Sequence, residues 1–166
     1  MAETVTLRAG RAGEGELLGE LGFSAWAEGE ISSAAGPGVD LDHVRGHFVA
    51  FCTDHYDTIL VAEAEGRPVG WGSRENRDNT VSDLWIAPEA QGRGIGRVLL
   101  EALETDIAKT GYGTAELETA AANAGGIRFY ERGGYRLVWR KIKFSEGVGR
   151  DVEKVGLVKP LGPKKD

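Results

Sequence analysis

Hydrophobic and polar positions along the first third of the chain predict one strand followed by two helices. Residues 4–9 alternate through Val5 and Leu7, which is the period of a half-buried strand. Apolar residues at positions 17, 18, 21, 25 and 26 then recur with helical spacing. The loop sequence SSAAGPG at 32–38 ends this helix, and a second amphipathic helix begins after Asp40, a residue type that caps helix N-termini.

The remainder of the chain predicts three strands and then two helix–strand units. Residues 58–73, TILVAEAEGRPVGWGS, indicate two strands on either side of a turn at 65–68. A third strand covers 81–87 and stops at Pro88, which has no N–H to donate to a ladder. The last predicted elements are a helix at 94–109, a strand at 115–119, a helix at 123–132 and strands at 135–144 and 152–158.

The predicted order is β-α-α-β-β-β-α-β-α-β-β, an α/β (α+β) fold built on about seven strands. A chain of 166 residues with 41% hydrophobic residues can bury one sizeable core. We therefore expect a single domain over residues 1–161 and a flexible tail over residues 162–166.

The charge balance narrows the expected partners. The formal net charge is −6 and the sequence pI is about 5.2, which argues against nucleic-acid binding because phosphate contacts need a basic face. A cationic small molecule or a basic peptide fits this sign better. The chain has no run of about eighteen apolar residues, and its first ten residues alternate polar and apolar. We expect no membrane span, no signal peptide and a cytoplasmic location.

Neither a disulfide nor a metal site is expected. Cys52 is the only cysteine, so an internal disulfide is excluded. His43 and His47 are four residues apart and are followed by Cys52 and His55, but Val44 stands where zinc proteases carry glutamate. We interpret these side chains as ordinary helix residues.

A glycine-rich turn, QGRGIGR at 91–97, precedes the predicted helix at 94–109. Helix N-termini leave N–H groups unpaired and carry a partial positive charge, so a turn without bulky side chains can approach a phosphate closely. The turn lacks the Gly-Lys-Ser/Thr of nucleotide triphosphatases and the G-x-G-x-x-G spacing of dinucleotide-binding folds. It predicts a pyrophosphate site, with a plain strand-to-helix turn as the alternative.

Two motifs in order resemble those of the GNAT acetyltransferase superfamily. LWIAPEAQGRGIG at 84–96 is similar to its acetyl-coenzyme A motif, and NAGGIRFYERGGY at 123–135 is similar to its second motif. The resemblance extends from Thr4 to about Leu161 and implies the family's acyl-CoA N-acyltransferase fold with a mixed central sheet. Gly126 departs from the alanine that is common in the family, and the similarity is weak over residues 10–57, where the acceptor would bind.

The resemblance implies that acetyl-CoA is the cosubstrate and that no metal is needed. Ile86 would pair with the pantetheine amide, and the Leu84 N–H would face the thioester carbonyl, an oxyanion donor worth about 3 kcal/mol. Asn123 would either bind the coenzyme arm or cap its helix. The implied coenzyme-binding residues are Ile86, Gln91, Gly92, Arg93, Gly94, Ile95, Gly96, Arg97, Asn123 and Tyr130.

The implied reaction is direct attack of a primary amine on the thioester in a ternary complex. An amine with a pKa of about 10.4 is almost entirely protonated at neutral pH, so a base is expected. Glu118 is the first candidate, because it stands twelve residues before Tyr130 as in the ribosomal-protein branch of the family; Asp83 and Glu63 are alternatives. Tyr130 occupies the family's general-acid position. Cys52 lacks a local base, so an acyl-cysteine intermediate is not expected.

The acceptor is expected to be the amine of a small molecule or peptide, and the protein to be monomeric or a homodimer. Candidate acceptor residues are Trp26, Glu28, Trp71, Asp83 and Trp85, with Glu30 nearby in sequence. Core packing of the tryptophans and a solvated acidic face are the simpler interpretations. Alternatives to an N-acetyltransferase are a non-catalytic acyl-CoA-binding regulatory module and an O-acyl or longer-acyl transferase.

Overall fold

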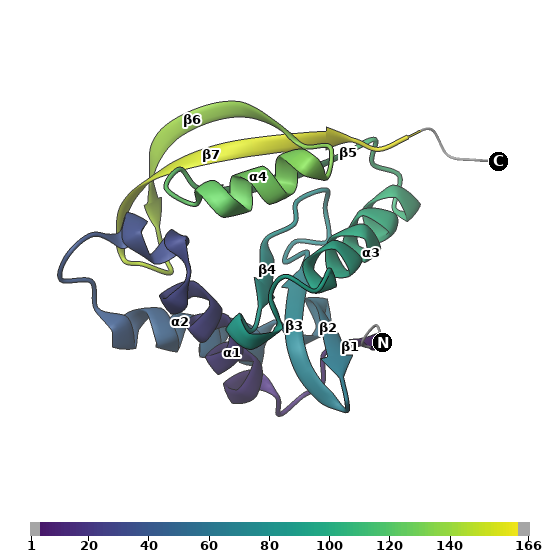
Figure 1. Ribbon diagram of the computed structural model, residues 1–166, viewed down its shortest axis with the longest axis horizontal. Coiled ribbons are helices and arrows are strands. Elements are labelled where there is room, and N and C mark those ends of the chain that lie inside the picture. Colours follow the sequence, from purple (N-terminus) through teal and green to yellow (C-terminus); the bar gives the residue numbers. More distant parts are fainter. Residues whose placement is uncertain (1–3, 163–166) are drawn as a thin grey trace.

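The structure is a computed structural model that describes residues 4–162 (Figure 1). Its order of helices and strands is the predicted one. The helices are α1 (Gly15–Glu28), α2 (Leu41–Asp54), α3 (Ile95–Lys109) and α4 (Ala124–Arg132), with short 3-10 turns η1 (Glu30–Ala35), η2 (Tyr56–Thr58) and η3 (Pro88–Ala90). The strands are β1 (Val5–Ala9), β2 (Ile59–Ala64), β3 (Arg67–Ser73), β4 (Asp83–Ile86), β5 (Thr114–Ala120), β6 (Arg136–Ser145) and β7 (Arg150–Pro160).

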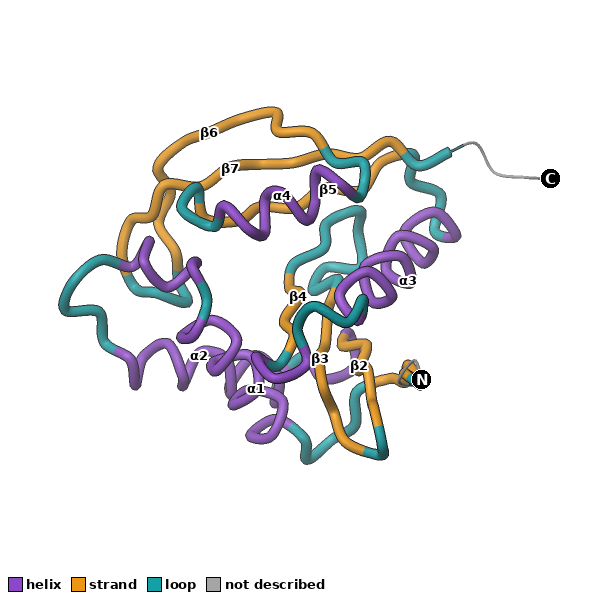
Figure 2. Tube along the Cα trace, in the orientation of Figure 1, coloured by secondary structure: helices purple, strands orange, loops and turns teal. Residues whose placement is uncertain are grey.

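The seven strands form two antiparallel sheets. One sheet has the order β1-β2-β3-β4 and the other the order β5-β7-β6. The prediction of one mixed sheet differs from this in detail: within residues 4–162, the two sheets are joined by a single parallel bridge between Thr80 and Glu116. There the Val81 N–H donates to the Glu116 carbonyl over 2.9 Å, and beyond this point β4 and β5 diverge (Figure 2).

Helices cover both faces of the first sheet. Trp71 on β3 points toward α1 and α2, where it is fully buried with Leu18 and Phe48. On the opposite face, apolar residues of β2 and β4 pack against Leu99 and Ile95 of α3. The second sheet packs its inner face against the far end of α3 through Leu117 and its neighbours.

Trp71 is therefore a core residue, and its prediction as an acceptor residue is wrong. Its side chain has no exposed area, and its Nε1–H donates to the Leu18 carbonyl over 2.9 Å. The indole joins α1 to the sheet, because its ring packs in an apolar cluster while its N–H donates to a backbone carbonyl of α1.

The described residues include no helix long and apolar enough to cross a membrane. The predicted tail at 162–166 falls outside the described residues except for Gly162, which is exposed.

Candidate active site

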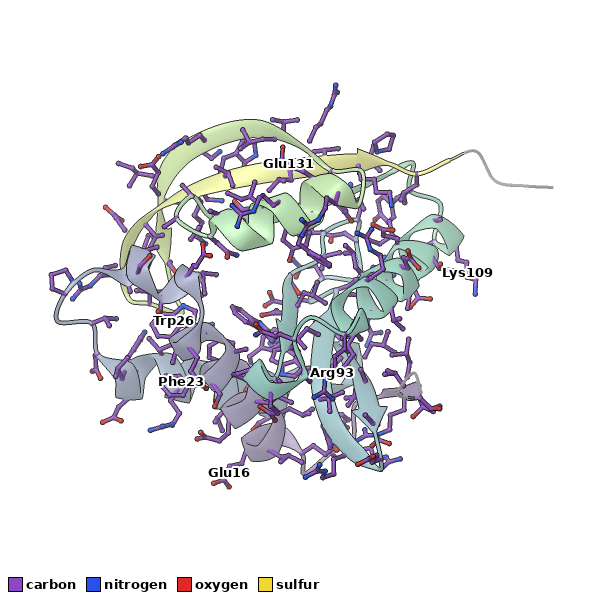
Figure 3. All side chains as sticks on the ribbon, in the orientation of Figure 1. Glu16, Phe23, Trp26, Arg93, Lys109 and Glu131 are labelled. Carbon is purple, nitrogen blue, oxygen red and sulfur yellow. The ribbon has the colours of Figure 1, made fainter. Side chains whose placement is uncertain are left out.

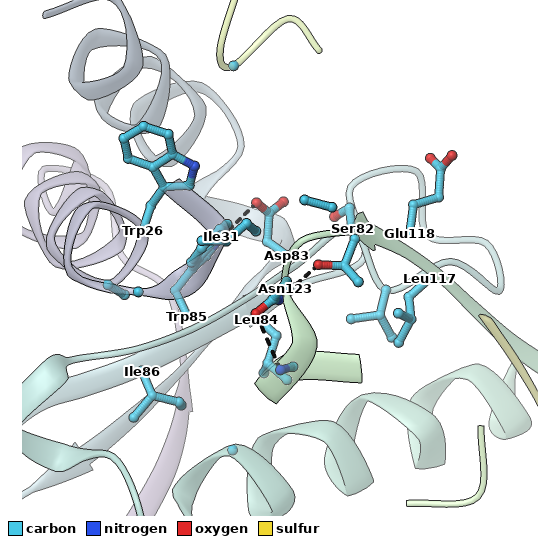
Figure 4. Close-up of a pocket in the computed structure, with 18 of the residues that line it drawn as sticks. Trp26, Ile31, Ser82, Asp83, Leu84, Trp85, Ile86, Leu117, Glu118 and Asn123 are labelled. Carbon is cyan, nitrogen blue, oxygen red and sulfur yellow. Dashed lines mark hydrogen bonds between the residues drawn. The ribbon is translucent and has the colours of Figure 1, made fainter. Parts of the chain in front are cut away.

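A cavity of about 1270 Å³ lies where the two sheets diverge. One side is formed by β4 and the glycine turn, the other by β5 and α4. Its far end is bounded by the α1–α2 segment and the loop between β6 and β7. Figure 4 shows part of its wall, with Trp26, Asp83, Trp85 and Glu118 among the labelled side chains.

The glycine turn presents its backbone to this cavity. Gly92 and Gly94 have φ values of 78° and 84°, in the left-handed region that favours glycine. Gly94 is the N-cap of α3, and no side chain caps this helix. The first N–H groups of α3 are thus available to an anion, and the helix dipole adds a partial positive charge.

The two arginines of the turn lie differently. Arg97 lines the cavity, and its guanidinium carbon is 5.5 Å from the centre of the Phe129 ring on α4. The Arg93 side chain instead extends toward β3, donates to the Glu89 carbonyl over 3.0 Å and lines a separate smaller hollow (Figure 3). In this conformation the Arg93 side chain does not face the cavity.

Backbone groups of Leu84 and Ile86, two of the predicted site residues, lie on the edge of β4 that faces the cavity. Hydrogen bonds alternate along an antiparallel strand, and the Ala87 N–H donates to the Val69 carbonyl of the neighbouring strand over 2.9 Å. The backbone groups of Leu84 and Ile86 therefore point away from β3 toward the gap. The side-chain amide of Gln91 donates to the Ile86 carbonyl over 3.0 Å, while the Leu84 and Ile86 side chains pack toward α3.

Helix α4 begins at Asn123 and brings Tyr130 to the cavity. The Asn123 Oδ1 accepts from the Gly126 N–H over 3.3 Å, and its Nδ2 donates to Thr119 Oγ1 over 3.0 Å. Asn123 is thus a helix cap here. The Tyr130 ring lies edge-on to Tyr135 at 5.8 Å, and burial together with the charge of Asp83 raises the pKa of the Tyr130 hydroxyl above its ordinary value.

The three carboxylates predicted as candidate bases have different surroundings. Asp83 lines the cavity, accepts from Trp85 Nε1 over 3.1 Å, and burial raises its pKa to about 7. Glu118 also lines the cavity, but it is ion-paired with Lys143 of β6 and points away from Asp83 (Figure 4). Glu63 is bound by Arg8 over 2.5 Å and is not part of the cavity wall.

The remaining predicted acceptor residues, Trp26, Glu28 and Trp85, all line the cavity. Trp85 meets the Phe48 ring edge-on at 5.0 Å, so α2 fixes one wall. Glu30 also lines the cavity and its Oε2 accepts from the Gly125 N–H at the start of α4 over 3.3 Å.

The histidines and the cysteine have different surroundings in the structure. The described residues contain no group of three or more metal-ligating side chains. Cys52 is fully buried, and burial raises the pKa of its thiol to about 12. His43 and His47 instead meet the loop between β6 and β7, a contact that no local sequence signal indicates, because about a hundred residues separate the partners.

The chain matches a protein-family model and several curated proteins. A model of the "Acetyltransferase (GNAT) family" matches residues 23–135, more than half of the chain. A ribosomal-protein-bS18-alanine N-acetyltransferase of Escherichia coli is 39% identical over 56 residues, which are 34% of this chain and 38% of that protein. A streptothricin acetyltransferase of Streptomyces lavendulae is 33% identical over 100 residues, which are 58% of this chain and 53% of that protein.

The match with these curated relatives spans only about a third to a half of their length. The fold itself is shared over nearly the whole chain. The PaiA N-acetyltransferase of Thermoplasma acidophilum, solved in complex with coenzyme A, superposes with a TM-score of 0.70 at 18% identity, covering 95% of this chain and 99% of that one. Sequence and fold agree that this chain belongs to the acetyltransferase (GNAT) family.

Proposed function

We propose that this protein transfers an acetyl group from acetyl-CoA to a primary amine by direct attack in a ternary complex. The observation that carries the proposal is the arrangement of one cavity: an uncapped helix N-terminus, the open edge of β4, an acidic side chain and a tyrosine follow one another along its wall. The relatives named for acetylating a ribosomal protein and streptothricin, together with a coenzyme A complex of the same fold, support it.

The residues of the turn fit the coenzyme diphosphate. Backbone N–H groups at 92–97 bind its oxygens at close range, because Gly92, Gly94 and Gly96 carry no side chain, and Arg97 adds a full charge. The gap-facing edge of β4 binds the pantetheine arm: Ile86 offers its backbone to the arm, and the Leu84 N–H stabilises the oxyanion that develops on the thioester carbonyl.

Asp83 and Tyr130 handle the protons. Asp83 accepts the proton that the ammonium must lose before its nitrogen lone pair can form the N–C bond, and a pKa of about 7 makes it a stronger base than an ordinary aspartate. When the C–S bond breaks, Tyr130 donates its proton to the leaving sulfur. Sequence spacing favours Glu118, but this side chain is ion-paired with Lys143 of β6 and points away from Asp83 (Figure 4).

The base assignment is tested by replacing Asp83 and, as a matched control, Glu118 with their amides. We expect D83N to lower kcat by about 100-fold, the usual size of a general-base contribution, and E118Q to change it little. In the unchanged protein kcat/KM should rise with pH up to about 7, because only the carboxylate form of Asp83 accepts a proton. In D83N the ammonium must lose its proton to solvent instead, so kcat/KM should lose the inflection near pH 7 and rise steadily toward the pKa of the amine, about 10.4.

Steady-state thiol release with a panel of amines measures the change in kcat, and a pH series from about 5 to 9 measures the pH dependence of kcat/KM. A large loss in E118Q with D83N nearly unchanged would make Glu118 the base and remove Asp83 from the mechanism. If acetyl-CoA binds but no amine releases thiol faster than water does, the protein is a coenzyme-binding module and the proposed activity is wrong.

A further inference from the structure

The loop between β6 and β7 docks onto the segment between α1 and α2. Arg150, the first residue of β7, donates to three carbonyl groups of that segment: to Ala35 over 2.9 Å, to Pro37 over 3.0 Å and to Gly38 over 3.1 Å. One guanidinium thus fixes a turn that is more than a hundred residues away in sequence. We call this contact, together with the contacts of His43, His47 and Val148 described below, the loop bridge.

Contacts of His43, His47 and Val148 complete the loop bridge. The His43 Nε2 is 2.9 Å from the Glu146 carbonyl, and the rings of His47 and His43 lie against Gly147 and Gly149. A Cβ at position 147 would lie 3.2 Å from the His47 ring, so a larger residue there would push the surfaces apart. Val148 joins the apolar cluster of α1 and α2. The bridge therefore combines apolar packing with directed hydrogen bonds.

The loop bridge closes the far end of the cavity. Ala35 and residues 145–148 all line that end, where the hairpin of β6 and β7 curves down to reach the α1–α2 segment (Figures 1 and 2). An extended peptide needs an open groove, since it continues at about 3.3 Å per residue beyond the residue that reacts. The loop bridge occupies the space into which the remaining residues of a peptide would extend on this side of the cavity. A small molecule has no such further residues.

The charges of the enclosed wall indicate the kind of small molecule. Among the residues that line the cavity, Asp and Glu number seven, and Lys and Arg number three. Arg97 lies at the turn, with Arg132 next to it at the end of α4, so among the described lining residues Lys154 is the one cation on the acceptor side, where most of the carboxylates lie. Glu28, Glu30 and Glu146 line this end of the cavity together with Asp83, so that a second ammonium group can be paired with a carboxylate.

We propose that the acceptor is a small amine carrying at least two ammonium groups, and that Arg150 determines this specificity by holding the cavity closed against peptides. The inference rests on the proposed acetyl transfer and adds the class of acceptor to it. One ammonium loses its proton to Asp83 and forms the new amide, while a second stays charged and is held by the carboxylates of the wall.

The test compares three probes under saturating acetyl-CoA: 1,4-diaminobutane, n-butylamine and an alanine-started hexapeptide. The first two differ by a single ammonium group. We expect kcat/KM for the diamine to exceed that for n-butylamine by at least about tenfold, the ratio for one partly desolvated ion pair of about 1.4 kcal/mol, and the peptide to be the poorest acceptor.

Replacing Arg150 tests its role in specificity. R150Q should raise kcat/KM for the hexapeptide several-fold relative to the diamine, with acetyl-CoA affinity unchanged by titration calorimetry. R140Q is the matched control, because Arg140 lies on the same β6–β7 hairpin and pairs with Glu153, but is outside the loop bridge and the cavity wall. If R150Q does not fold, H43A removes one bond of the bridge and should shift the same ratio in the same direction.

Each remaining outcome overturns one specific statement. A peptide that is the best acceptor of the unchanged protein, or a diamine no better than n-butylamine, overturns this inference and leaves the proposed acetyl transfer standing. An unchanged peptide-to-diamine ratio in both R150Q and H43A overturns the role of the bridge. Failure of every acceptor, with acetyl-CoA still bound, contradicts the proposed function itself.

Discussion

At the scale of single residues, the proposed base Asp83 and the proposed acid Tyr130 have surroundings that suit two different proton transfers. Burial raises both pKa values, but an aspartate with a pKa of about 7 is half ionised near neutral pH, whereas a buried tyrosine stays protonated. The charge of Asp83 contributes to the shift of Tyr130, which indicates that the two groups face one shared volume. Acyl transfer from a thioester to an acceptor that arrives as an ammonium requires a base that is ionised and an acid that is protonated at the same pH.

Removing the Tyr130 hydroxyl should therefore affect the chemical step. We expect Tyr130→Phe to lower kcat by about tenfold or more, in the range for loss of a general acid, while acetyl-CoA affinity stays nearly intact. The ring contacts with Phe129 and Tyr135 do not need the hydroxyl, so the fold should be preserved. Single-turnover kinetics and calorimetry separate the two quantities. Unchanged single-turnover rates would exclude Tyr130 as the acid.

Sequence could identify some of these residues and not others. Tyr130, the glycines of the turn and the lining residues Trp26 and Trp85 follow from motifs and spacing. The raised pKa of Asp83 could not be predicted, because it comes from enclosure by helices far away in the chain. The same holds for Glu118, whose partner Lys143 is on another strand, and for Trp71, whose burial depends on where α1 crosses the sheet.

At the scale of elements, the strand–turn–helix unit from β4 to α3 forms the proposed coenzyme site. The strand ends at Ile86, two residues before Pro88, the turn adopts left-handed φ values at Gly92 and Gly94, and the helix begins without a side-chain cap. The uncapped start of α3 presents its first N–H groups to the cavity. A carboxylate introduced into this turn would oppose the diphosphate and strain the backbone.

Gly94→Asp should weaken acetyl-CoA binding by at least about tenfold, the effect of roughly 1.4 kcal/mol. Gly13→Asp is the matched control: Gly13 has a φ of 90°, no atom within 4 Å of an added Cβ, and a place outside the cavity wall. Both variants gain one negative charge and a similar backbone strain. Titration calorimetry gives the two dissociation constants, and equal values in both variants would place the diphosphate elsewhere.

Elements were more predictable than the contacts between them. The order of helices and strands follows from the hydrophobic pattern, and the predicted cap at Asp40 is confirmed, with its side chain accepting from the His43 N–H over 3.2 Å. The division of the sheet was not predicted, because divergence of β4 and β5 leaves no trace in the period of either strand. The loop bridge was missed for a related reason: Arg150 and Ala35 lie at opposite ends of the chain.

At the scale of the whole molecule, the cavity is bounded by both sheets. The parallel bridge at Thr80 and Glu116 joins them at one end, and the loop bridge reaches from β7 to the α1–α2 segment at the other. A coenzyme held by the turn and by α4 would add contacts between these two parts. It should bind the folded state and not the unfolded chain.

Acetyl-CoA should accordingly raise the unfolding temperature. At a free concentration of about 100 times Kd the gain is about 2.7 kcal/mol, which corresponds to a shift of about 5–10 °C for a domain of this size. Thermal unfolding followed at several coenzyme concentrations measures the shift, with Gly94→Asp as the variant that should require more coenzyme for the same effect. A midpoint independent of coenzyme concentration would contradict binding to the folded protein.

The burial of Cys52 has a practical consequence for the thiol-release assays. Reagents that detect released thiol react with the thiolate, and Cys52 is fully buried among the residues of α1 and α2 with a pKa of about 12. The folded protein therefore adds no background signal to a colorimetric assay, and the colour measures only the thiol of the released coenzyme A. The same sulfur becomes reactive once the cluster beneath α1 and α2 opens, so the chain carries an intrinsic reporter of local unfolding.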